Sequence, residues 1–550
     1  PHPIDKKGPD IDTCDKAVRA VGLPCEDPEV VQALQLLRAM TLQEKVQQMS
    51  GRTYDVNNMF DQADNKRLGI PGYRYMDGPR GVRWMNTNYG TTVFPVAAAR
   101  ASSWNLDIEQ AVGDAEADEM RYLGRHVLLA PTINQVMHPR WGRAQESYGE
   151  DSFLLGEMGA AFIRGAQAAP TNPADWRIQA CAKHFAANNI EDQRIYVNAV
   201  LDERTLREVY LPHFQRCIAA GVGSVMSAYN RVNGEWCAEN AHLLRDILKG
   251  EWGFDGFVES DWLLGMHDTV GSIRAGLDIE MPRPKVYGRN LLAAVESGTV
   301  PVELVDDAVR RVLRIMIRFG IFDGRPHAAP SVIACAAHTD LAREVAQKSL
   351  VLLRNEGELL PLDRARLRRI AVVGELAGAK NLGDRGSSYV SPPWVVTALQ
   401  GLQDAAGPAI EVEPFLTDAP NAQQLDRIAS ADAVIVVAGL SSKDEGEGQV
   451  TVGDRLRLEL PEAQEELILS VVAANPRTAV VLEGGSAIVV ERWIERVPAV
   501  LIAWYPGMEG GHAIAAGLFG DVNPAGRLPL TFVRAASDLP SFDVEHDEIE

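Results

Sequence analysis

The sequence predicts an α/β protein in which a (β/α) TIM-type barrel is followed by an α/β sandwich domain with a mostly parallel sheet. First, short apolar runs alternate with amphipathic stretches through the first 320 residues, which is the spacing of βα units. Second, four further apolar runs, separated by helical patterns, follow a break rich in Gly and Pro. At 550 residues the chain is too long for one ordinary core, so two large domains and a remnant are expected.

The elements of the first domain follow in chain order. Residues 1–28 are rich in Pro and Asp and predict an irregular lead-in. Residues 29–320 predict the barrel, which begins with a helix over residues 42–49 whose capping box is Thr41 and Glu44. Strands are expected at residues 73–76, 127–130, 178–182, 224–227 and 257–258, and helices at residues 203–220 and 243–248.

The second domain is expected over residues 346–535, after a linker at residues 321–345 where Gly, Pro and small residues interrupt the pattern. Its buried strands are predicted at residues 370–373, 433–437, 479–482 and 499–503, with a helix at residues 461–474. Residues 536–550 are acidic and lack a core pattern, so we expect a C-terminal remnant there.

Charge and cysteine content narrow the function classes. The formal net charge of -21 argues against nucleic acid or an anionic membrane as partner, and no apolar run is long enough to span a bilayer. Cys14 and Cys25 are candidates for a disulfide, whereas Cys181, Cys217 and Cys237 have the pattern of buried small hydrophobes. Because the chain starts at Pro1, a removed leader would make the protein periplasmic or secreted, and otherwise it is expected in the cytoplasm.

The strongest candidate for chemistry is Asp261, which stands with Trp262 just after the predicted strand at residues 257–258. A carboxylate at the end of a buried strand is costly unless it is paired or functional, and in a barrel this position is the floor of the active site. A carboxylate beside an aromatic ring suits a sugar site. The alternative is an Asp that only caps the next helix. Chemically capable side chains follow other predicted strands too, namely Asp77, Lys183, His184, Tyr229 and Asn230.

A second carboxyl group is expected in the loop at residues 443–448, after the predicted strand at residues 433–437. A glycosidase that retains anomeric configuration needs one carboxylate as nucleophile and another as acid/base. Glycines flank Glu447 on both sides, which gives its backbone freedom to aim the carboxyl group at another surface. Repulsion among three nearby carboxyls favours a raised pKa for one of them. The alternative is a solvated acidic loop.

Two polar clusters could hold sugar hydroxyls. The first combines Lys183 and His184 with Asn188, Asn189 and Arg194, and its alternative is an interior ion-pair network. The second is the stretch at residues 139–143, which has guanidinium groups beside an aromatic ring and whose alternative is a solvent-facing loop or a phosphate contact. The motifs of dinucleotide-binding proteins, NTPases, serine hydrolases and zinc peptidases are absent from the sequence.

Taken together, these motifs resemble those of glycoside hydrolase family 3, the β-glucosidase type, over nearly the whole chain. Among them are Lys183-His184-Phe185, Ser260-Asp261-Trp262 and Gly446-Glu447-Gly448. The other matching motifs are at residues 76–79, 139–143, 148–151, 202–204, 226–230, 253–256, 352–355, 453–455 and 523–529.

The resemblance implies an active site between a barrel and an α/β sandwich, with Asp261 as nucleophile and Glu447 as acid/base. Glu445 is the rival for the second role. The residues that match the terminal-sugar subsite are Asp77, Arg143, Lys183, His184, Arg194, Met226, Tyr229 and Trp262, and Ser388 or its neighbour Ser387 matches a contact from the second domain. Tyr229 is expected to orient Asp261. Many family members continue into a fibronectin-type III domain; because this sequence stops at Glu550, we expect either a shorter architecture or a chain that is cut before that domain.

The expected activity is exo-acting hydrolysis of a terminal β-linked sugar, with glucose as the default. The stretch after Phe185 differs from the loop of the branch that acts on N-acetylglucosamine. A β-xylosidase and a glycoside phosphorylase are the alternative enzymes, and an inactive carbohydrate-binding protein is the alternative of another class. The resemblance implies a glycoside as the partner, and no metal or organic cofactor.

Overall fold

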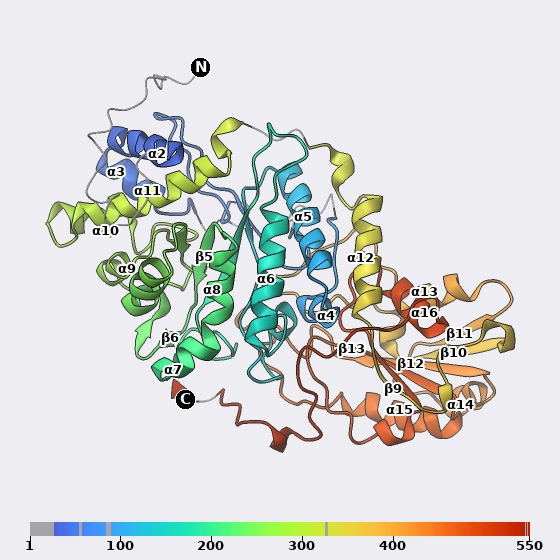
Figure 1. Cartoon of the computed structure of the whole chain (residues 1–550). Helices are drawn as coiled ribbons and strands as arrows, with labels where there is room; N and C mark the ends of the chain where they lie inside the picture. The colour runs from blue at the N-terminus through green and yellow to red at the C-terminus, as the bar shows by residue number, and fades with distance from the viewer. Residues whose placement is uncertain are drawn as a thin grey trace.

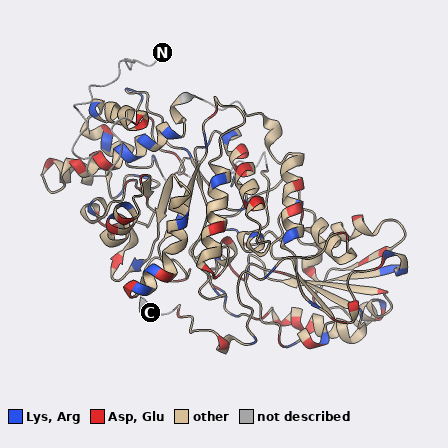
Figure 2. Cartoon of the chain, viewed as in Figure 1, with Lys and Arg blue, Asp and Glu red and all other residues tan. Residues whose placement is uncertain are grey.

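The computed structural model describes residues 27–549 apart from residues 54, 56, 57, 84–89, 325–327, 545 and 547. Figure 1 shows two bodies, a barrel domain built from the first half of the chain and a layered domain built from the second. Lys and Arg lie among Asp and Glu on the same outer helices (Figure 2). Within the described residues, no helix combines the length and the apolarity that crossing a membrane requires.

Five parallel strands form the main wall of the barrel. They pair in the order in which they occur, and each overlaps one of the five predicted runs. The third is longer than predicted and includes Lys183 and His184. The strands are β1 (Tyr75–Asp77), β2 (Val127–Leu129), β3 (Gln179–Phe185), β5 (Ser224–Ser227) and β8 (Phe257–Glu259).

Three short segments at residues 50–51, 61–62 and 279–280 close this wall. Their pairs are Glu259 with Ile279 and Ser50 with Glu280 in parallel, and Gly51 with Gln62 and Asp61 with Arg74 antiparallel. Arg74 directly precedes β1, so these pairs return the sheet to its first strand. The predicted barrel is therefore confirmed, with one antiparallel segment among its members.

Helices cover the outside of the barrel. The predicted capping box is confirmed at the start of α3 (Leu42–Gln48), where the Thr41 hydroxyl accepts from the Glu44 amide and the Glu44 carboxylate accepts from the Thr41 amide. The other long helices of this layer are α2 (Pro28–Ala39), α5 (Leu106–Tyr122), α6 (Ser152–Ala166), η5 (His242–Glu251), α10 (Gly288–Glu296) and α11 (Val302–Arg318).

One predicted helix, at residues 203–220, is interrupted. It divides into α7 (Glu203–Thr205), a π-helical turn η3 (Leu206–Tyr210) and α8 (Pro212–Ala219). The break falls before Pro212, which has no amide hydrogen to continue the helical bonding.

The second domain is a six-stranded sheet between two helical layers. Residues of β10, β12, β13 and β14 point alternately to the two faces, where they form separate cores with α14 and α15 on one side and α13 and α16 on the other. The strand order is β11 (Glu411–Phe415), β10 (Arg369–Val373), β12 (Ala433–Gly439), β13 (Thr478–Glu483), β14 (Ala499–Ile502) and antiparallel β9 (Val351–Asn355). The helices are α13 (Ala398–Ala406), α14 (Ala422–Ala429), α15 (Glu462–Ala474) and α16 (Gly510–Phe519).

The four predicted strands and the predicted helix of this domain are confirmed, but the two edge strands β9 and β11 were not predicted. Pro414 lies within β11, which is tolerated because an edge strand leaves one row of amides unpaired. The predicted linker is also partly wrong, since its second half forms α12 (Ala336–Ser349), which packs against α4 (Ala97–Ser102), α5 and α16. Its alanines are strong helix formers.

The C-terminal remnant returns to the barrel domain. Its short strand β15 (Glu548–Ile549) pairs in parallel with β4 (Asn198–Ala199) and lies beside α7 (Figure 1). Cys181, Cys217 and Cys237 are free and buried, as predicted. Cys14 and Cys25 lie outside the described residues.

Candidate active site

A cavity of about 240 Å³ lies where the carboxyl ends of the barrel strands face two loops of the second domain. Both predicted catalytic carboxylates line it, and so do all the residues matched to the terminal-sugar subsite. The lining consists of Met59, Phe60, Asp77, Arg83, Arg143, Lys183, His184, Arg194, Met226, Tyr229, Asp261, Trp262, Leu263, Ser387, Glu447 and Val450. The two loops are those that follow β10 and β12, and they contribute Ser387, Glu447 and Val450.

Asp261 stands two residues beyond β8 with only 7% of its surface exposed. Its Oδ1 accepts from the Trp262 amide at 2.7 Å, whereas its Oδ2 has no hydrogen-bond partner and lies 3.7 Å from His184 Nε2. Burial raises the pKa of Asp261 above its usual value, although Arg194, Arg143 and Lys183 favour the anion. One carboxylate oxygen is therefore free to react.

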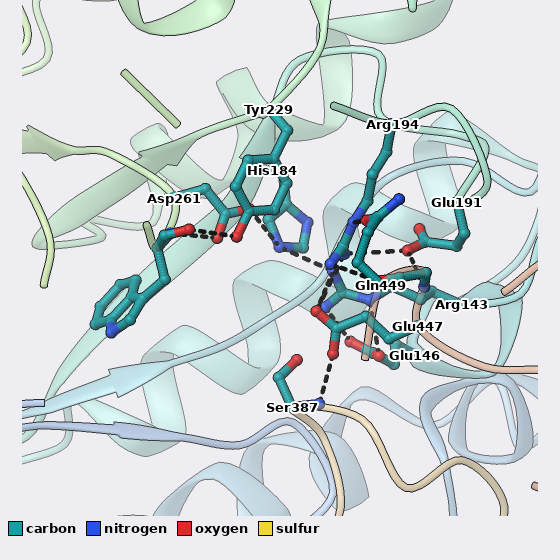
Figure 3. A network of polar contacts seen from close by, with 12 residues as sticks. Arg143, Glu146, His184, Glu191, Arg194, Tyr229, Asp261, Ser387, Glu447 and Gln449 are labelled. Atoms are coloured by element: carbon teal, nitrogen blue, oxygen red, sulfur yellow. Dashed lines mark hydrogen bonds and ion pairs between the residues drawn. The ribbon is translucent and has the colours of Figure 1, made fainter. Parts of the chain in front are cut away.

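Tyr229, which was expected to orient Asp261, contacts the segment that carries it. Its hydroxyl donates to the Trp262 carbonyl at 2.7 Å, which fixes the backbone beside Asp261. The Trp262 indole is held by a 3.0 Å bond to the Met59 carbonyl. The guanidinium of Arg194 lies over the Tyr229 ring, 4.9 Å from its centroid (Figure 3).

Charged side chains form the buried end of the cavity. Asp77, the last residue of β1, lies 3.7 Å from Lys183 Nζ and 3.5 Å from Arg83 Nη1. Burial raises the pKa of Asp77, while Lys183 and Arg83 oppose that shift. Arg83 was missed from the sequence, although it lies only six positions beyond Asp77 in a turn closed by a bond from its amide to the Asp77 carbonyl.

His184 is a neutral hydrogen-bond acceptor toward the cavity. Arg143 can only donate, and its Nη1 lies 3.3 Å from His184 Nε2, so the proton is on Nδ1, 3.3 Å from Asn134 Oδ1. Burial, with Arg143, Lys183 and Arg194 nearby, holds the pKa of His184 well below its usual range. Glu146 fixes Arg143 through a two-pronged ion pair of 2.9 and 2.7 Å.

Glu447 reaches the cavity from the second domain. Its Oε1 accepts from Arg194 Nη1 at 3.0 Å, and its Oε2 accepts from the Ser387 amide at 2.5 Å (Figure 3). Burial alone would raise the pKa of Glu447, but Arg143, Arg194 and Ser387 outweigh burial and hold that pKa well below its usual value. A raised pKa was expected for one of the three carboxyls of this loop, and Glu447 is not that one.

Glu445 points away from the cavity. It is fully buried and accepts from the Tyr505 hydroxyl at 2.7 Å and from the Gly485 amide at 2.8 Å. Burial raises the pKa of Glu445, but the carboxyl group does not line the cavity. Of the two candidates, only Glu447 shares a space with Asp261.

The serine prediction and part of the hydroxyl clamp need correction. Ser388 is buried and its carbonyl accepts from Arg80, while its neighbour Ser387 lines the cavity and binds Glu447. Asn188 and Asn189 do not line the cavity, because the chain turns away after Phe185. Which of two adjacent residues faces a cavity depends on a loop backbone that the sequence does not specify.

Arg194 also belongs to an interior ion-pair network, the alternative given for its cluster, with Glu191 as a partner that was not predicted. Its other contacts are Glu191 at 3.0 Å, the Gln449 side chain at 2.8 Å and the Gly448 carbonyl at 2.8 Å. Glu191 is fully buried and also accepts from the Trp141 indole at 2.9 Å. The stretch at residues 139–143 is thus packed into the domain interface, not a solvent-facing loop.

The family models match both halves of the chain. The N-terminal domain of glycosyl hydrolase family 3 matches residues 23–315, and the C-terminal domain of that family matches residues 350–549. The chain belongs to glycoside hydrolase family 3.

Similar proteins span most of this family 3 chain. The thermostable β-glucosidase B of Acetivibrio thermocellus is 34% identical over 94% of this chain and 68% of its own length. A β-xylosidase of Formosa agariphila is 33% identical over 92% of this chain and 73% of its own. The structure of β-glucosidase 3B from Thermotoga neapolitana in complex with glycerol aligns with a TM-score of 0.84 at 30% identity, over 92% of this chain and 77% of that one.

The family 3 chain is thus a glycoside hydrolase, and its cavity lies between the two matched domains. No group of three or more potential metal-binding side chains occurs within the part of the chain that the structure describes.

Proposed function

We propose that the protein is an exo-acting β-glucosidase that releases a terminal β-linked glucose with retention, using Asp261 as nucleophile and Glu447 as acid/base. The observation that carries this proposal is that two carboxylates from different domains share one small cavity with a buried charged end. Relatives named as β-glucosidases, at 34% and 33% identity over nearly the whole chain, support the choice of glucose.

The environment of Asp261 suits a nucleophile. Its Oδ2 has no partner to displace, and three cations nearby favour its ionised form and oppose the effect of burial. Attack of this oxygen on C1 would give a covalent glycosyl-enzyme, which water then hydrolyses. The bond from Tyr229 to the neighbouring carbonyl keeps the strand end from moving during both steps.

Glu447 must alternate between two protonation states. With Arg194 and Ser387 as partners it is a carboxylate, which is the form that activates water in the second step. The first step requires a proton on Glu447, so Arg194 has to release it. Arg194 keeps bonds to Glu191, Gln449 and the Gly448 carbonyl and therefore stays in place when it does so.

The cavity suits one sugar ring. Its volume of about 240 Å³ lies below the range of pockets for drug-sized ligands. Asp77, Lys183 and Arg83 offer acceptors and donors for several hydroxyls of one ring. A single ring held with its far side against these groups gives cleavage at the chain end only.

The deciding experiment is azide rescue of two variants. In Asp261→Ala, azide can enter on the nucleophile side, and the expected product from an activated aryl β-glucoside is the α-glucosyl azide. In Glu447→Ala, azide attacks the glycosyl-enzyme from the other face, and the expected product is the β-glucosyl azide. The reverse stereochemistry, or Asp261→Ala retaining more than about a tenth of wild-type activity, would contradict the assignment, since the nucleophile makes the bond that carries both steps.

Sugar identity and acceptor are tested in the same assay. The relatives include a β-xylosidase and an exo-α-(1→6)-L-arabinopyranosidase, so p-nitrophenyl β-glucoside, β-xyloside and α-L-arabinopyranoside are compared side by side. The glucoside is expected to have the highest kcat/KM. Release of sugar 1-phosphate on addition of phosphate would identify a phosphorylase instead.

A further inference from the structure

The two ends of the cavity differ in chemistry. Its inner end is charged and buried. The apolar residues that line the cavity are Met226 and Trp262, already assigned to the sugar subsite, and Met59, Phe60, Leu263 and Val450. Leu263 and Val450 are 46% and 54% exposed, so they lie at the mouth of the cavity, whereas Phe60 is buried. We call Met59, Phe60, Leu263 and Val450 the apolar rim.

The rim is built on the two segments that carry the carboxylates. Leu263 follows Asp261 by two positions, and Val450 follows Glu447 by three. Each turn contains a residue with a left-handed backbone, Leu263 itself with φ of 69° and Gln449 with φ of 60°. This conformation is unfavourable for both residue types, and such strain persists at functional sites where the surrounding structure enforces it.

Specific bonds hold both turns. The Leu263 amide donates to the Met281 carbonyl at 3.2 Å, and the Leu264 amide donates to the Trp262 carbonyl at 2.8 Å. In the other turn, the Gln449 side chain accepts from Arg194 Nε at 2.8 Å. The same contacts that position the carboxylates therefore present Leu263 and Val450 to the solvent.

We propose that the apolar rim is the leaving-group subsite, and that it selects β-glucosides with an alkyl or aryl aglycone over gluco-oligosaccharides. This inference rests on the proposed function. Because the inner cavity holds one ring, the leaving group lies at the mouth, against Leu263 on one side and Val450 on the other. An exposed apolar surface bordered by polar groups is typical of a ligand groove.

A sugar ring bound against the apolar rim would gain less binding free energy than an alkyl or aryl group. Its hydroxyl groups would lose water to side chains that can neither donate nor accept, which is unfavourable. An alkyl chain loses apolar contact with water there, which is favourable in proportion to the area covered.

The test measures kcat/KM for n-alkyl β-glucosides from methyl to octyl, with cellobiose alongside. We expect a rise of about two- to fourfold per added methylene over the first few carbons, followed by a plateau where the rim ends. The octyl glucoside is expected to exceed cellobiose by at least tenfold.

Two variants and a matched control assign the effect to the rim. Leu263→Asn removes the apolar group but suits the left-handed backbone, and Val450→Thr changes polarity at nearly constant shape. Each is expected to lower the ratio of octyl to methyl kcat/KM about threefold to tenfold, mainly through KM. Leu456→Asn is the control, because Leu456 lies on the same loop, is 90% exposed and does not line the cavity.

The outcomes separate the two proposals. Equal turnover of all alkyl glucosides, a preference for cellobiose, or the same loss of ratio in Leu456→Asn overturns the rim proposal while the β-glucosidase assignment stands. A protein that releases glucose from none of these substrates overturns both.

Discussion

Replacing Asp454 is expected to weaken the fold and the active site together. This carboxylate belongs to the second domain but accepts three backbone amides of the first, from Gly142 at 2.8 Å, Glu191 at 2.8 Å and Asp192 at 3.0 Å. It is 4% exposed, so water has little access to these amides. Glu191 in turn binds Arg194, which links this contact to Glu447.

The magnitude follows from the number of amides left without an acceptor. Asp454→Ala leaves three, at about 1–3 kcal/mol each, so a loss of about 3–6 kcal/mol is expected after partial relaxation. Asp454→Asn keeps one oxygen, which can serve the Glu191 and Asp192 amides, and loses the third bond at about 1–3 kcal/mol. With an unfolding entropy of roughly 1.2 kcal/mol/K for a chain of 550 residues, the Tm falls by about 3–5 °C for Ala and 1–3 °C for Asn.

Differential scanning calorimetry at one scan rate measures the stability loss, and kcat on an aryl glucoside measures the effect on the site. We expect kcat to fall about tenfold to a hundredfold in Asp454→Ala, because the Glu191 backbone no longer fixes Arg194. Asp426→Ala, an exposed Asp on α14, is the control and should change neither quantity. An Ala variant with a Tm within 1 °C of the wild type, or an Asn variant as unstable as the Ala variant, would refute this reasoning.

Three further outcomes are expected. Arg194→Gln removes a cation that lowers the pKa of Glu447, so the alkaline limb of the kcat/KM profile should move up by about 1–2 pH units; an unmoved limb would argue against Glu447 as the acid. Burial raises the pKa of Glu116 to about 8, so the free energy of unfolding should fall as the pH rises from the ordinary pKa of a glutamate toward 8. Glu116→Gln should therefore flatten the fall in Tm over that pH interval. Arg100 and Glu109 form a fully buried pair, so Arg100→Met should cost about 3–5 kcal/mol and a second change, Glu109→Leu, should recover most of it; no recovery in thermal melts would contradict the pairing argument.

The buried strands could be predicted because a strand that is buried on both faces is apolar at nearly every position of its sequence. In β12 and β13 every residue is buried, and the apolar runs there are continuous. The polar residues that end the barrel strands were equally visible, since a charge such as Asp261 interrupts an apolar run abruptly. Parallel strands end on the same side of a sheet, so Asp77, Lys183 and Asp261 had to come together.

Elements that are held by only one or two pairings have no such continuous apolar run in the sequence. The segments that close the barrel pair through only one or two residues each, and Ser50 meets Glu280 across most of the first domain. The edge strand β11 contains two glutamates, one of them exposed, and an exposed proline, so its pattern is not that of a buried strand. These elements are fixed by the strands beside them.

The sequence by itself determined the two domains, most of the parallel strands and the side chains available to the cavity. Only the tertiary structure decided that Glu447 and not Glu445 shares the cavity with Asp261, and that Ser387 and not Ser388 lines this cavity. It also decided the charge of Glu447, because Arg194 is 253 positions away in the chain yet 3.0 Å away in space. Burial and charge pairing act through space, so residues adjacent in sequence can differ in what they face and in which protons they hold.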